Sequence, residues 1–420
     1  MPATFSPDAG LLSPEFVENP YPFYARLREE APVCWSDAWR CWLLTRHDDV
    51  VETLSAPARF SSVRRLTSVF ESELSPAFQD RIRPLINHYN AGLINVDGAD
   101  HSRLRRLVQQ GFTPSAIQKL QDRIRTLIRE ILARAAEKPE MDVIRDLAYP
   151  LPITVITELM GIPEAERDNF KLWSGKTVEF MATPRATEEV LLGSNHGLVQ
   201  MRERFRSLTE ERRREPKADL ITTLVQARDA GDKLSDEEMI STLTTILIGG
   251  HETTTNLLGS SILRLHQHPE QKEKLRANPA LIRNAVEEFL RFDAPFQRNR
   301  RVVVDDCEFR GQSLRRGQIV LQFLGAANRD PAANPDPDRL DVERSPVRQV
   351  AFGHGAHFCL GAALARLEVQ CAIAELLHGS YQIEVLEERP VWKDGLLRGL
   401  RQLRARVRPV AATSAHSPLS

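Results

Sequence analysis

The chain has 420 residues, of which 56 are Lys or Arg and 57 are Asp or Glu, so its formal net charge is −1. A charge this close to zero gives no long-range field that would favour nucleic acid or an anionic membrane as a partner. The five cysteines are odd in number and lack Cys-x-x-Cys spacing, which argues against disulfide frameworks, zinc ribbons and iron–sulfur clusters and is typical of a reducing cytoplasm.

The first predicted elements are a short helix and a hairpin. The helix over 25–30 follows Asn19-Pro20-Tyr21-Pro22, because proline is favoured at a helix start. Alternating residues at 33–35 and 42–45 predict a small β-hairpin. Helical patterns dominate from about 114 to 290, and short strands are predicted over 301–309, 318–323 and 381–385. The chain is therefore predicted to be mainly α with a minor β component.

The longest predicted helix runs from Ser235 to about His268. Ser235 and Glu238 form a capping box at its start, and Pro269 marks its end. Apolar residues recur at helical spacing along one face. At 1.5 Å per residue the helix would be roughly 50 Å long, so it must cross the whole domain.

The chain shows no sign of a domain boundary. No Gly/Ser-rich linker is present, so residues 1–420 are predicted to form a single large domain, with a disordered tail over 411–420. No run reaches the roughly 18 apolar residues that a membrane span requires. We therefore expect a cytoplasmic protein that does not enter a membrane.

A loop with several glycines precedes a predicted helix over 362–368. The segment from Phe352 to Gly361 reads Phe-Gly-His-Gly-Ala-His-Phe-Cys-Leu-Gly and contains Cys359. A cysteine at a helix N-terminus has a lowered pKa, because the helix dipole and unpaired backbone N–H groups favour the thiolate. The segment therefore predicts a thiolate that binds a metal. A buried packing cysteine is the alternative, and it needs neither the glycines nor the helix start.

The pattern Phe-x-x-Gly-x-x-x-Cys-x-Gly resembles the cysteine-ligand loop of the cytochrome P-450 monooxygenases. The resemblance extends over nearly the whole chain and is to the soluble bacterial type. It implies the cytochrome P-450 fold, mainly α with minor β, around a buried haem b. It also implies that Cys359 is the axial ligand of the haem iron. Phe352, Gly355 and Gly361 match cofactor-binding positions of the family.

Two adjacent glycines interrupt the long helix, each at a cost of roughly 1 kcal/mol relative to alanine. The segment Gly249-Gly250-His251-Glu252-Thr253 resembles the oxygen-binding helix of the cytochromes P-450. The resemblance implies that Thr253 hydrogen-bonds dioxygen or water, that Glu252 helps to deliver protons, and that the haem approaches the backbone at Gly250. The alternative is a kinked core helix whose threonines bond back to the preceding turn.

Haem carries two propionates, which need cationic partners if they are buried. His101 and Arg105 lie one helical turn apart and so share a face. By resemblance these two residues, together with Arg301 and His357, bind the propionates. Arg298 and Arg300 are alternatives to Arg301.

A Glu-x-x-Arg pair lies further along the chain, at Glu288 and Arg291. Such pairs are usually solvated surface contacts worth a few tenths of a kcal/mol. In the family that the chain resembles, this pair braces the core behind the haem, so both residues are assigned a structural role.

The substrate pocket is predicted by resemblance alone. Its expected lining includes parts of 66–94 and 181–192, and five further positions complete it: His251, Phe296, Gln297, Leu396 and Leu397. Most of this lining is apolar, which indicates a hydrophobic substrate such as a polyketide, terpenoid, steroid or fatty acid.

The implied activity is insertion of one oxygen atom from O2 into such a substrate, by hydroxylation or epoxidation, in bacterial secondary or xenobiotic metabolism. The chain has no spare length for an electron-transfer domain, so electrons are expected from a separate ferredoxin or flavodoxin with its NAD(P)H reductase. Arg103, Arg106 and Arg348 are candidates for a basic docking patch, with a solvated face as the alternative.

Three other functions stay open at this point. A peroxygenase driven by hydrogen peroxide would need no redox partner, but the dedicated peroxygenases of the family lack the acid–alcohol pair. A haem-thiolate sensor or binding protein would need no proton relay, so it would tolerate loss of Thr253. A haem-free helical scaffold would carry Cys359 by chance.

Overall fold

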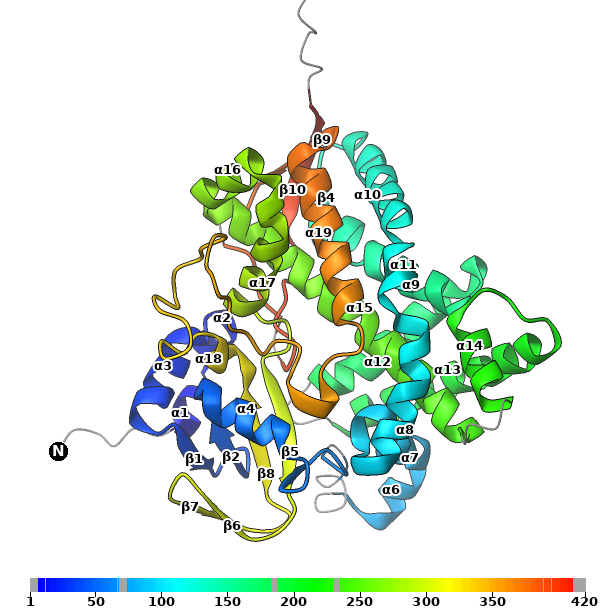
Figure 1. Cartoon of the computed structure of the whole chain (residues 1–420), viewed down its shortest axis with the longest axis vertical. Coiled ribbons are helices and arrows are strands. Elements are labelled where there is room, and N and C mark those ends of the chain that lie inside the picture. The colour runs from blue at the N-terminus through cyan, green and yellow to red at the C-terminus, as the bar shows by residue number, and fades with distance from the viewer. Residues whose placement is uncertain are drawn as a thin grey trace, which may run out of the picture.

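The computed structural model describes residues 7–11, 13–65, 67, 74–182, 187–229, 234–387, 389–393 and 395–410 (Figure 1). The predicted tail over 411–420 lies outside the described residues. The prediction of a mainly α fold with a minor β component is confirmed, since helices make up most of the molecule and a five-stranded sheet lies at one side (Figure 1).

The five-stranded sheet packs beside the N-terminal helices α1 (Pro7–Leu11), α2 (Pro14–Glu18) and α3 (Tyr21–Glu30). Its strand order is β1-β2-β8-β5-β3. The strands are β1 (Val33–Ser36), β2 (Cys41–Leu44), β3 (Phe60–Ser61), β5 (Arg298–Val303) and β8 (Ile319–Phe323). In the predicted hairpin, β1 pairs antiparallel with β2, and Trp35 lies opposite Trp42.

Two smaller sheets complete the β structure. One has the order β4-β10-β9 and contains β4 (Met141–Asp142), β9 (Tyr381–Val385) and β10 (Arg404–Pro409). The other pairs β6 (Cys307–Phe309) with β7 (Gln312–Leu314). The strand predicted over 301–309 is therefore two strands, β5 and β6. They are separated near Asp306, whose carboxylate accepts hydrogen bonds from Arg315 and from the backbone of Arg316.

The remaining helices form the bulk of the molecule (Figure 1). They are α4 (His47–Ser55), α6 (Pro76–Arg81), α7 (Arg83–Ala91), α8 (Gly98–Gln109), α9 (Pro114–Gln118), α10 (Gln121–Ala136), α11 (Pro150–Met160), α12 (Arg167–Ala182), α13 (Glu188–Arg214), α14 (Leu220–Asp229), α15 (Asp236–Gln267), α16 (Pro269–Ala277), α17 (Ile282–Phe292), α18 (Leu324–Asn328) and α19 (Ala362–His378).

The long helix predicted from Ser235 is α15, and both predicted ends are right. The Ser235 hydroxyl accepts a hydrogen bond from the backbone N–H of Glu238, and the Glu238 carboxylate accepts one from the Ser235 backbone, so the capping box is formed. At 32 residues α15 is about 48 Å long. It packs against α11, α13 and α19 and so crosses the interior.

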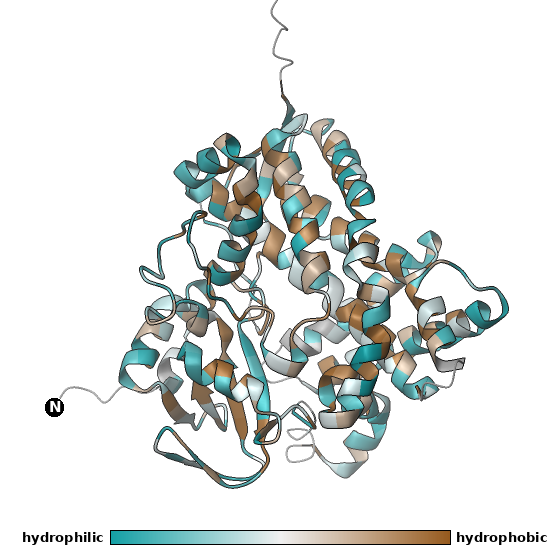
Figure 2. Cartoon of the chain, viewed as in Figure 1, coloured by the Kyte–Doolittle hydropathy of each residue, from teal (hydrophilic) through white to brown (hydrophobic). Residues whose placement is uncertain are grey.

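The main hydrophobic core is formed by apolar side chains packed between these helices. Outer helices such as α10 carry both apolar and hydrophilic residues (Figure 2), and the apolar residues Ile124, Ile128 and Leu132 of α10 are almost completely buried. This burial of one face is what an amphipathic surface helix is expected to show. Among the described residues, none of the helices combines the length and the apolar character that a membrane crossing requires.

Candidate active site

Cys359 lies in the loop that leads into α19, and it is the exposed cysteine of the described chain. Its backbone N–H donates a hydrogen bond to the carbonyl oxygen of Phe352 at 2.9 Å, which closes the loop. Gly353 and Gly355 have φ angles of +72° and +70°, a conformation that favours glycine. By contrast, Cys371 is 3% exposed and packs in the core. Cys359 therefore differs from a packing cysteine.

The surroundings of Cys359 have opposing effects on the pKa of its thiol. Burial by the surrounding protein atoms raises the pKa of this thiol above its usual value, whereas the sequence predicted a lowered one. The backbone N–H groups of Gly361 and Ala362 and the charges of Arg105 and Arg366 act in the opposite direction but do not outweigh burial. A bound metal cation adds a far larger charge and deprotonates a coordinating thiol outright. The arrangement therefore suits a thiolate that becomes stable when it binds a cation.

Arg366 is a functional candidate that the sequence reasoning missed. Its guanidinium carbon lies 4.5 Å from the centroid of the Phe352 ring. Its Nε and Nη2 atoms donate to the Glu287 carboxylate at 2.6 and 2.9 Å. The Glu287 contact fixes Arg366 close to the cysteine loop, where its charge favours the Cys359 thiolate.

Gly355 and Gly361, the two glycines of the loop that were predicted to bind the cofactor, have different surroundings. A side chain at Gly361 would meet no atom within 4 Å, so this position faces open space. A Cβ at Gly355 would lie 3.1 Å from the Leu54 carbonyl oxygen and 3.2 Å from Cα of Ser55. Gly355 therefore lets the loop pack against the end of α4, while Gly361 leaves room for a flat group.

Two of the predicted propionate partners, His101 in α8 and His357 in the cysteine loop, lie against each other with ring centroids 4.1 Å apart. His357 Nε2 is 2.8 Å from Asp97 Oδ1. His101 is 3% exposed, and burial lowers its pKa to about 4, helped by His357 and Arg105. Its Nε2 atom is buried without a hydrogen-bond partner in the described part of the chain.

Arg301 reaches the same region from β5. It is 1% exposed, and burial lowers its pKa to about 10, while Asp97 acts in the opposite direction. Arg298, an alternative at the sequence level, donates to the Gly395 carbonyl at 2.8 Å and stacks on Trp39. The geometry therefore favours Arg301 over Arg298 as the residue of this cluster.

Arg65 belongs to the cluster and was not predicted. Its Nη1 atom donates to Asn299 Oδ1 at 2.8 Å, and burial together with the nearby Arg301 charge lowers its pKa to about 9. Asp97 was missed as well. Burial alone would raise the pKa of Asp97, but hydrogen bonds from His357, Ser61 and the Ser62 backbone hold it well below its usual range.

The charges of this cluster do not balance. Three guanidinium groups and two imidazoles surround one carboxylate, that of Asp97; the cationic or potentially cationic members are Arg65, His101, Arg105, Arg301 and His357. Buried cations need counter-charges. A group that carries two carboxylates would supply them and would give His101 Nε2 a partner. Together with the accessible Cys359, these residues fit a haem with its two propionates.

The paired glycines of α15 have different surroundings. A Cβ at Gly250 would lie 3.0 Å from Cγ1 of Ile156, so Gly250 makes room for α11. Gly249 is exposed although α15 crosses the interior, and a Cβ there would meet no atom within 4 Å. A flat group can therefore approach the backbone at Gly249, and the predicted approach at Gly250 stays a prediction.

The acid and the alcohol that follow are both held by hydrogen bonds. Thr253 Oγ1 donates to the Gly249 carbonyl at 2.9 Å. Glu252 Oε1 accepts from Lys393 Nζ at 2.6 Å, and the two side chains are 14% and 30% exposed. Lys393, from the segment after β9, was not predicted, because a contact between positions so far apart leaves no local pattern.

His251 and Gln297, which were predicted to line the substrate pocket, are both buried. His251 is 1% exposed, its Nδ1 is 2.8 Å from the Leu247 carbonyl oxygen, and its ring packs edge-on against Tyr149. Gln297 is 4% exposed and lies between Tyr24 and the backbone of Gly325. Both side chains are largely buried, and their assignment to a substrate pocket stays a prediction.

The other predicted pocket residues come together. Phe296 and Leu397 form an isolated antiparallel bridge, and the Leu396 carbonyl accepts a hydrogen bond from the Gln297 backbone at 3.3 Å. Phe296 and Leu396 are partly exposed, whereas Leu397 is buried. The other predicted lining segments lie partly outside the described residues, at 66, 68–73 and 183–186.

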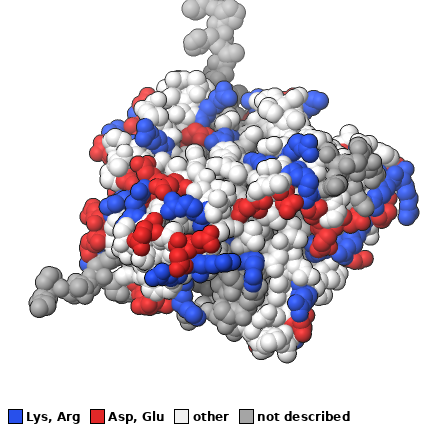
Figure 3. Space-filling model, turned by 60° about the horizontal axis from the view of Figure 1, so that its bottom comes forward, with Lys and Arg blue, Asp and Glu red and all other residues white. Residues whose placement is uncertain are grey.

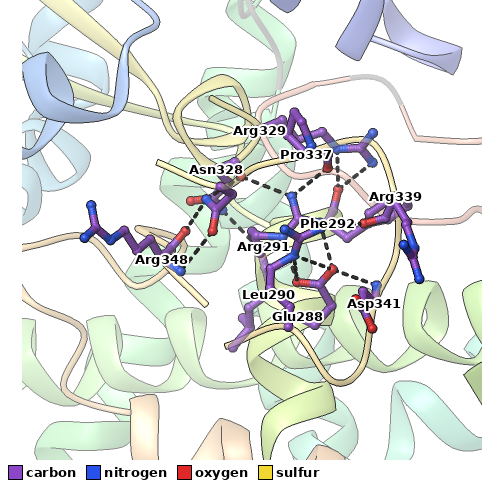
Figure 4. Close-up of polar contacts among 12 residues, drawn as sticks. Glu288, Leu290, Arg291, Phe292, Asn328, Arg329, Pro337, Arg339, Asp341 and Arg348 are labelled. Atoms are coloured by element: carbon purple, nitrogen blue, oxygen red, sulfur yellow. Dashed lines mark hydrogen bonds and ion pairs between the residues drawn. The ribbon is translucent and has the colours of Figure 1, made fainter. Parts of the chain in front are cut away.

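Glu288 and Arg291 of α17 are both completely buried, with Nε of Arg291 2.7 Å from Oε2 of Glu288 (Figure 4). Arg291 also donates to the carbonyl oxygens of Asn328, Pro337 and Arg339. The pair thus ties α17 to the long segment that precedes the cysteine loop.

The predicted basic docking patch is partly neutralised. Arg103 Nη2 lies 2.5 Å from Glu238 Oε1 and 3.2 Å from Asp100 Oδ1. On the face shown in Figure 3, acidic and basic side chains are interspersed. Arg348 is exposed.

Comparison with known proteins gives consistent matches. A family model described as cytochrome P450 matches residues 195–397. The polyketide biosynthesis cytochrome P450 PksS of Bacillus subtilis (strain 168) is 36% identical over 399 residues, which are 93% of this chain and 96% of that protein. The vitamin D(3) 25-hydroxylase of Pseudonocardia autotrophica is 37% identical over 410 residues, 96% of this chain and 97% of that protein.

A solved structure is similar as well. The crystal structure of P450BioI in complex with hexadec-9Z-enoic acid ligated acyl carrier protein matches with a TM-score of 0.85 and 36% sequence identity. The match covers 94% of this chain and 100% of that chain. The similarity therefore extends over nearly the full length in both sequence and structure.

Proposed function

The chain belongs to the cytochrome P450 family of haem-thiolate monooxygenases, and on this premise we propose that it inserts one oxygen atom of O2 into an apolar small molecule. Haem b is the cofactor of this family. The proposed products are alcohols or epoxides, formed in bacterial secondary or xenobiotic metabolism.

The observation that carries the proposal is the exposed Cys359 thiol at the start of α19, a helix that packs against the glycine-containing helix α15. Cys359 would hold the iron, and Arg65, His101, Arg105, Arg301 and His357 would bind the propionates. When bound, haem with a thiolate ligand supplies the activation of O2, because the thiolate favours O–O cleavage over reversible oxygen storage.

The role proposed for Glu252 and Thr253 is proton delivery. Lys393 Nζ donates to Glu252 Oε1, and its side chain is more exposed than that of Glu252. A proton can thus reach the carboxylate from the solvent side when this ion pair opens. The Thr253 hydroxyl donates to the Gly249 carbonyl, and rotation about χ1 would direct it elsewhere. The two side chains would then pass a proton from solvent into a dry cavity.

The substrate is proposed to be largely hydrocarbon. The Phe296–Leu397 bridge and Leu396 put three apolar side chains at one place in the fold. The relatives point the same way, since their names refer to a polyketide pathway and to vitamin D3, and the P450BioI complex holds a hexadecenoic acyl group. Polyketides, terpenoids, steroids and fatty acids or fatty acyl chains are therefore the first compounds to test.

Electrons are proposed to come from a separate ferredoxin or flavodoxin with an NAD(P)H reductase. The docking surface is proposed to include Arg348 and the end of α8. Because Arg103 is already paired with Glu238 and Asp100, we expect its replacement to change the reduction rate less than that of Arg348.

The test uses the purified holoenzyme. A reduced, carbon-monoxide-treated spectrum checks thiolate ligation, and compounds of the four classes are then screened for shifts of the ferric spectrum. Hits are incubated with NADPH, a surrogate ferredoxin and reductase, and isotopically labelled O2. Label in the product and dependence on reductase support the proposal.

Two results would contradict it. Product that forms only with hydrogen peroxide would indicate a peroxygenase. Tight substrate binding with no product under either condition, and unchanged binding after Thr253→Ala, would indicate a sensor or binding protein.

A further inference from the structure

A second cavity lies where the end of α15 meets the end of α17 and the start of α3. Its volume is about 270 Å³. Residues from five separate parts of the chain line it, and those used most below are Tyr21, Arg264, Arg329, Arg389, Trp392 and Arg398. Four of these six are arginines. Glu18 is the acidic residue of the lining, and it is exposed.

Behind the cavity, one buried carboxylate holds two of the arginines. Asp293 is 2% exposed and accepts hydrogen bonds from Tyr21 Oη at 2.7 Å, Arg264 Nε at 2.5 Å and Arg398 Nε at 3.1 Å. Arg398 also donates to the Val17 and Glu18 carbonyls. One carboxylate thus faces two guanidinium groups, so the net charge of these three side chains at the cavity is positive.

Arg329 adds to this positive charge. Its guanidinium carbon lies 3.4 Å from the Tyr21 ring centroid and 3.8 Å from that of Phe292, so the group is stacked between two aromatic rings. Its ion-pair partner is Asp338, which is 73% exposed. An exposed partner neutralises little, because water screens the pair.

Two residues of the lining, Arg389 and Trp392, have N–H donors that bind no other described residue. Within the described chain, Arg389 is exposed and makes no hydrogen bond or ion pair. Trp392 is 9% exposed, and its indole N–H donates to no described residue. Its ring is stacked on Arg398, 3.7 Å from the guanidinium carbon. An indole nitrogen can only donate, so this N–H is available to an acceptor from a ligand.

We propose that this cavity binds a small polyanion, such as phosphate or a di- or tricarboxylate. Excess guanidinium charge, unused N–H donors and a volume suited to a few non-hydrogen atoms all favour a compact acceptor-rich anion. The aromatic faces are already covered by Arg329 and Arg398, so an apolar ligand would gain little there.

The cavity is separate from the proposed haem site. Thr253 and Arg264 both lie in α15, about 17 Å apart along the helix axis. The two regions are nevertheless joined by sequence, because Trp392 of the cavity is followed directly by Lys393, which pairs with Glu252. An anion that orders this segment would therefore act on the chain next to the proton-delivery acid.

The experiment is a calorimetric titration of the ferric holoenzyme, with no substrate or reductant present. Sodium phosphate, citrate and acetate are titrated in turn, and sodium chloride keeps the ionic strength constant, because screening alone changes surface electrostatics. We expect saturable one-site binding of phosphate or citrate and much weaker binding of the monoanion acetate. Tighter phosphate would indicate a phosphate-bearing ligand, and tighter citrate a polycarboxylate.

Variants test the location. Arg389→Ala removes the unpaired guanidinium and should weaken binding about tenfold or more. Trp392→Phe removes the indole N–H but keeps a ring for Arg398, and should also weaken binding. Arg214→Ala is the matched control, since Arg214 is exposed and lies at the far end of α13.

The proposal is wrong if none of the anions binds the wild-type holoenzyme saturably, or if Arg389→Ala and Arg214→Ala bind equally well. Because the titration contains neither substrate nor reductant, its result does not depend on the proposed reaction.

Discussion

Replacing Arg291 with lysine keeps the charge but removes the planar fork of donors, and this change isolates what the buried Glu-x-x-Arg pair contributes. Arg291 makes five hydrogen bonds, two to Glu288 and three to backbone carbonyls. Lysine has three N–H donors on a single atom. At least two of these hydrogen bonds are therefore lost in a region where both side chains are 0% exposed.

Each buried hydrogen bond from a charged donor is worth roughly 1.5–3 kcal/mol. Two of them predict that Arg291→Lys lowers the free energy of unfolding by about 4 kcal/mol. The chain offers a matched control, since Glu273 and Arg276 of α16 have the same spacing but are 63% and 32% exposed. For Arg276→Lys we expect a change of no more than about 0.5 kcal/mol.

The assay is urea unfolding of the holoprotein followed by far-ultraviolet circular dichroism, with midpoints and slopes compared among the three proteins. A loss below about 1 kcal/mol for Arg291→Lys would refute the reasoning, and so would equal losses for the two variants. If Arg291→Lys yields too little folded protein, Glu288→Gln tests the same network, because it leaves the Arg291 cation buried without its counter-charge.

Three further predictions concern the site and its pH dependence. Cys359→Ser should abolish the thiolate-type carbon monoxide spectrum of the reduced protein, whereas Cys307→Ser should leave it unchanged. Thr253→Ala should lower product per NADPH consumed and raise peroxide release at least severalfold, whereas Thr223→Ala, which removes a similar back-bond in α14, should not. Burial lowers the pKa of His88 from 6.5 to about 3. The unfolded chain therefore binds a proton that the folded chain does not, and stability falls as the pH drops from 6.5 toward 3, by at most about 1.4 kcal/mol per unit. In His88→Gln the urea midpoint should fall less between pH 7 and pH 4; an equal fall would contradict this assignment.

Local patterns predicted the elements that local chemistry determines. The capping box at Ser235 and Pro269 gave both ends of α15, and the cysteine loop gave the start of α19, because caps and glycine turns act within a few residues. The strand predicted over 301–309 was placed well but not divided. Asp305 and Asp306 disfavour a strand and mark the break, and the hydrogen bonds that stabilise the turn come from Arg315 and Arg316.

The parts of the site that sequence reasoning missed depend on contacts between distant segments. Arg65 approaches Arg301 and Asp97 only because the chain folds back on itself, and Lys393 reaches Glu252 from the other end of the sequence. The difference between Gly249 and Gly250 also depends on such a contact. Both glycines of α15 look equivalent in the sequence, and packing against Ile156 is what distinguishes them.

The two Glu-x-x-Arg pairs show which information decides between a surface contact and a core brace. The spacing is the same at Glu273–Arg276 and Glu288–Arg291, so the motif itself carries no information about burial. The neighbours differ: α17 is apolar on both sides of its pair, at Ala285, Val286, Phe289 and Leu290, whereas α16 carries charged residues around Glu273. A buried ion pair persists only where backbone acceptors complete its hydrogen bonds. The segment 328–339 supplies those acceptors for Arg291, so the sequence signal for this brace is an apolar helix combined with a long irregular segment that can fold over it.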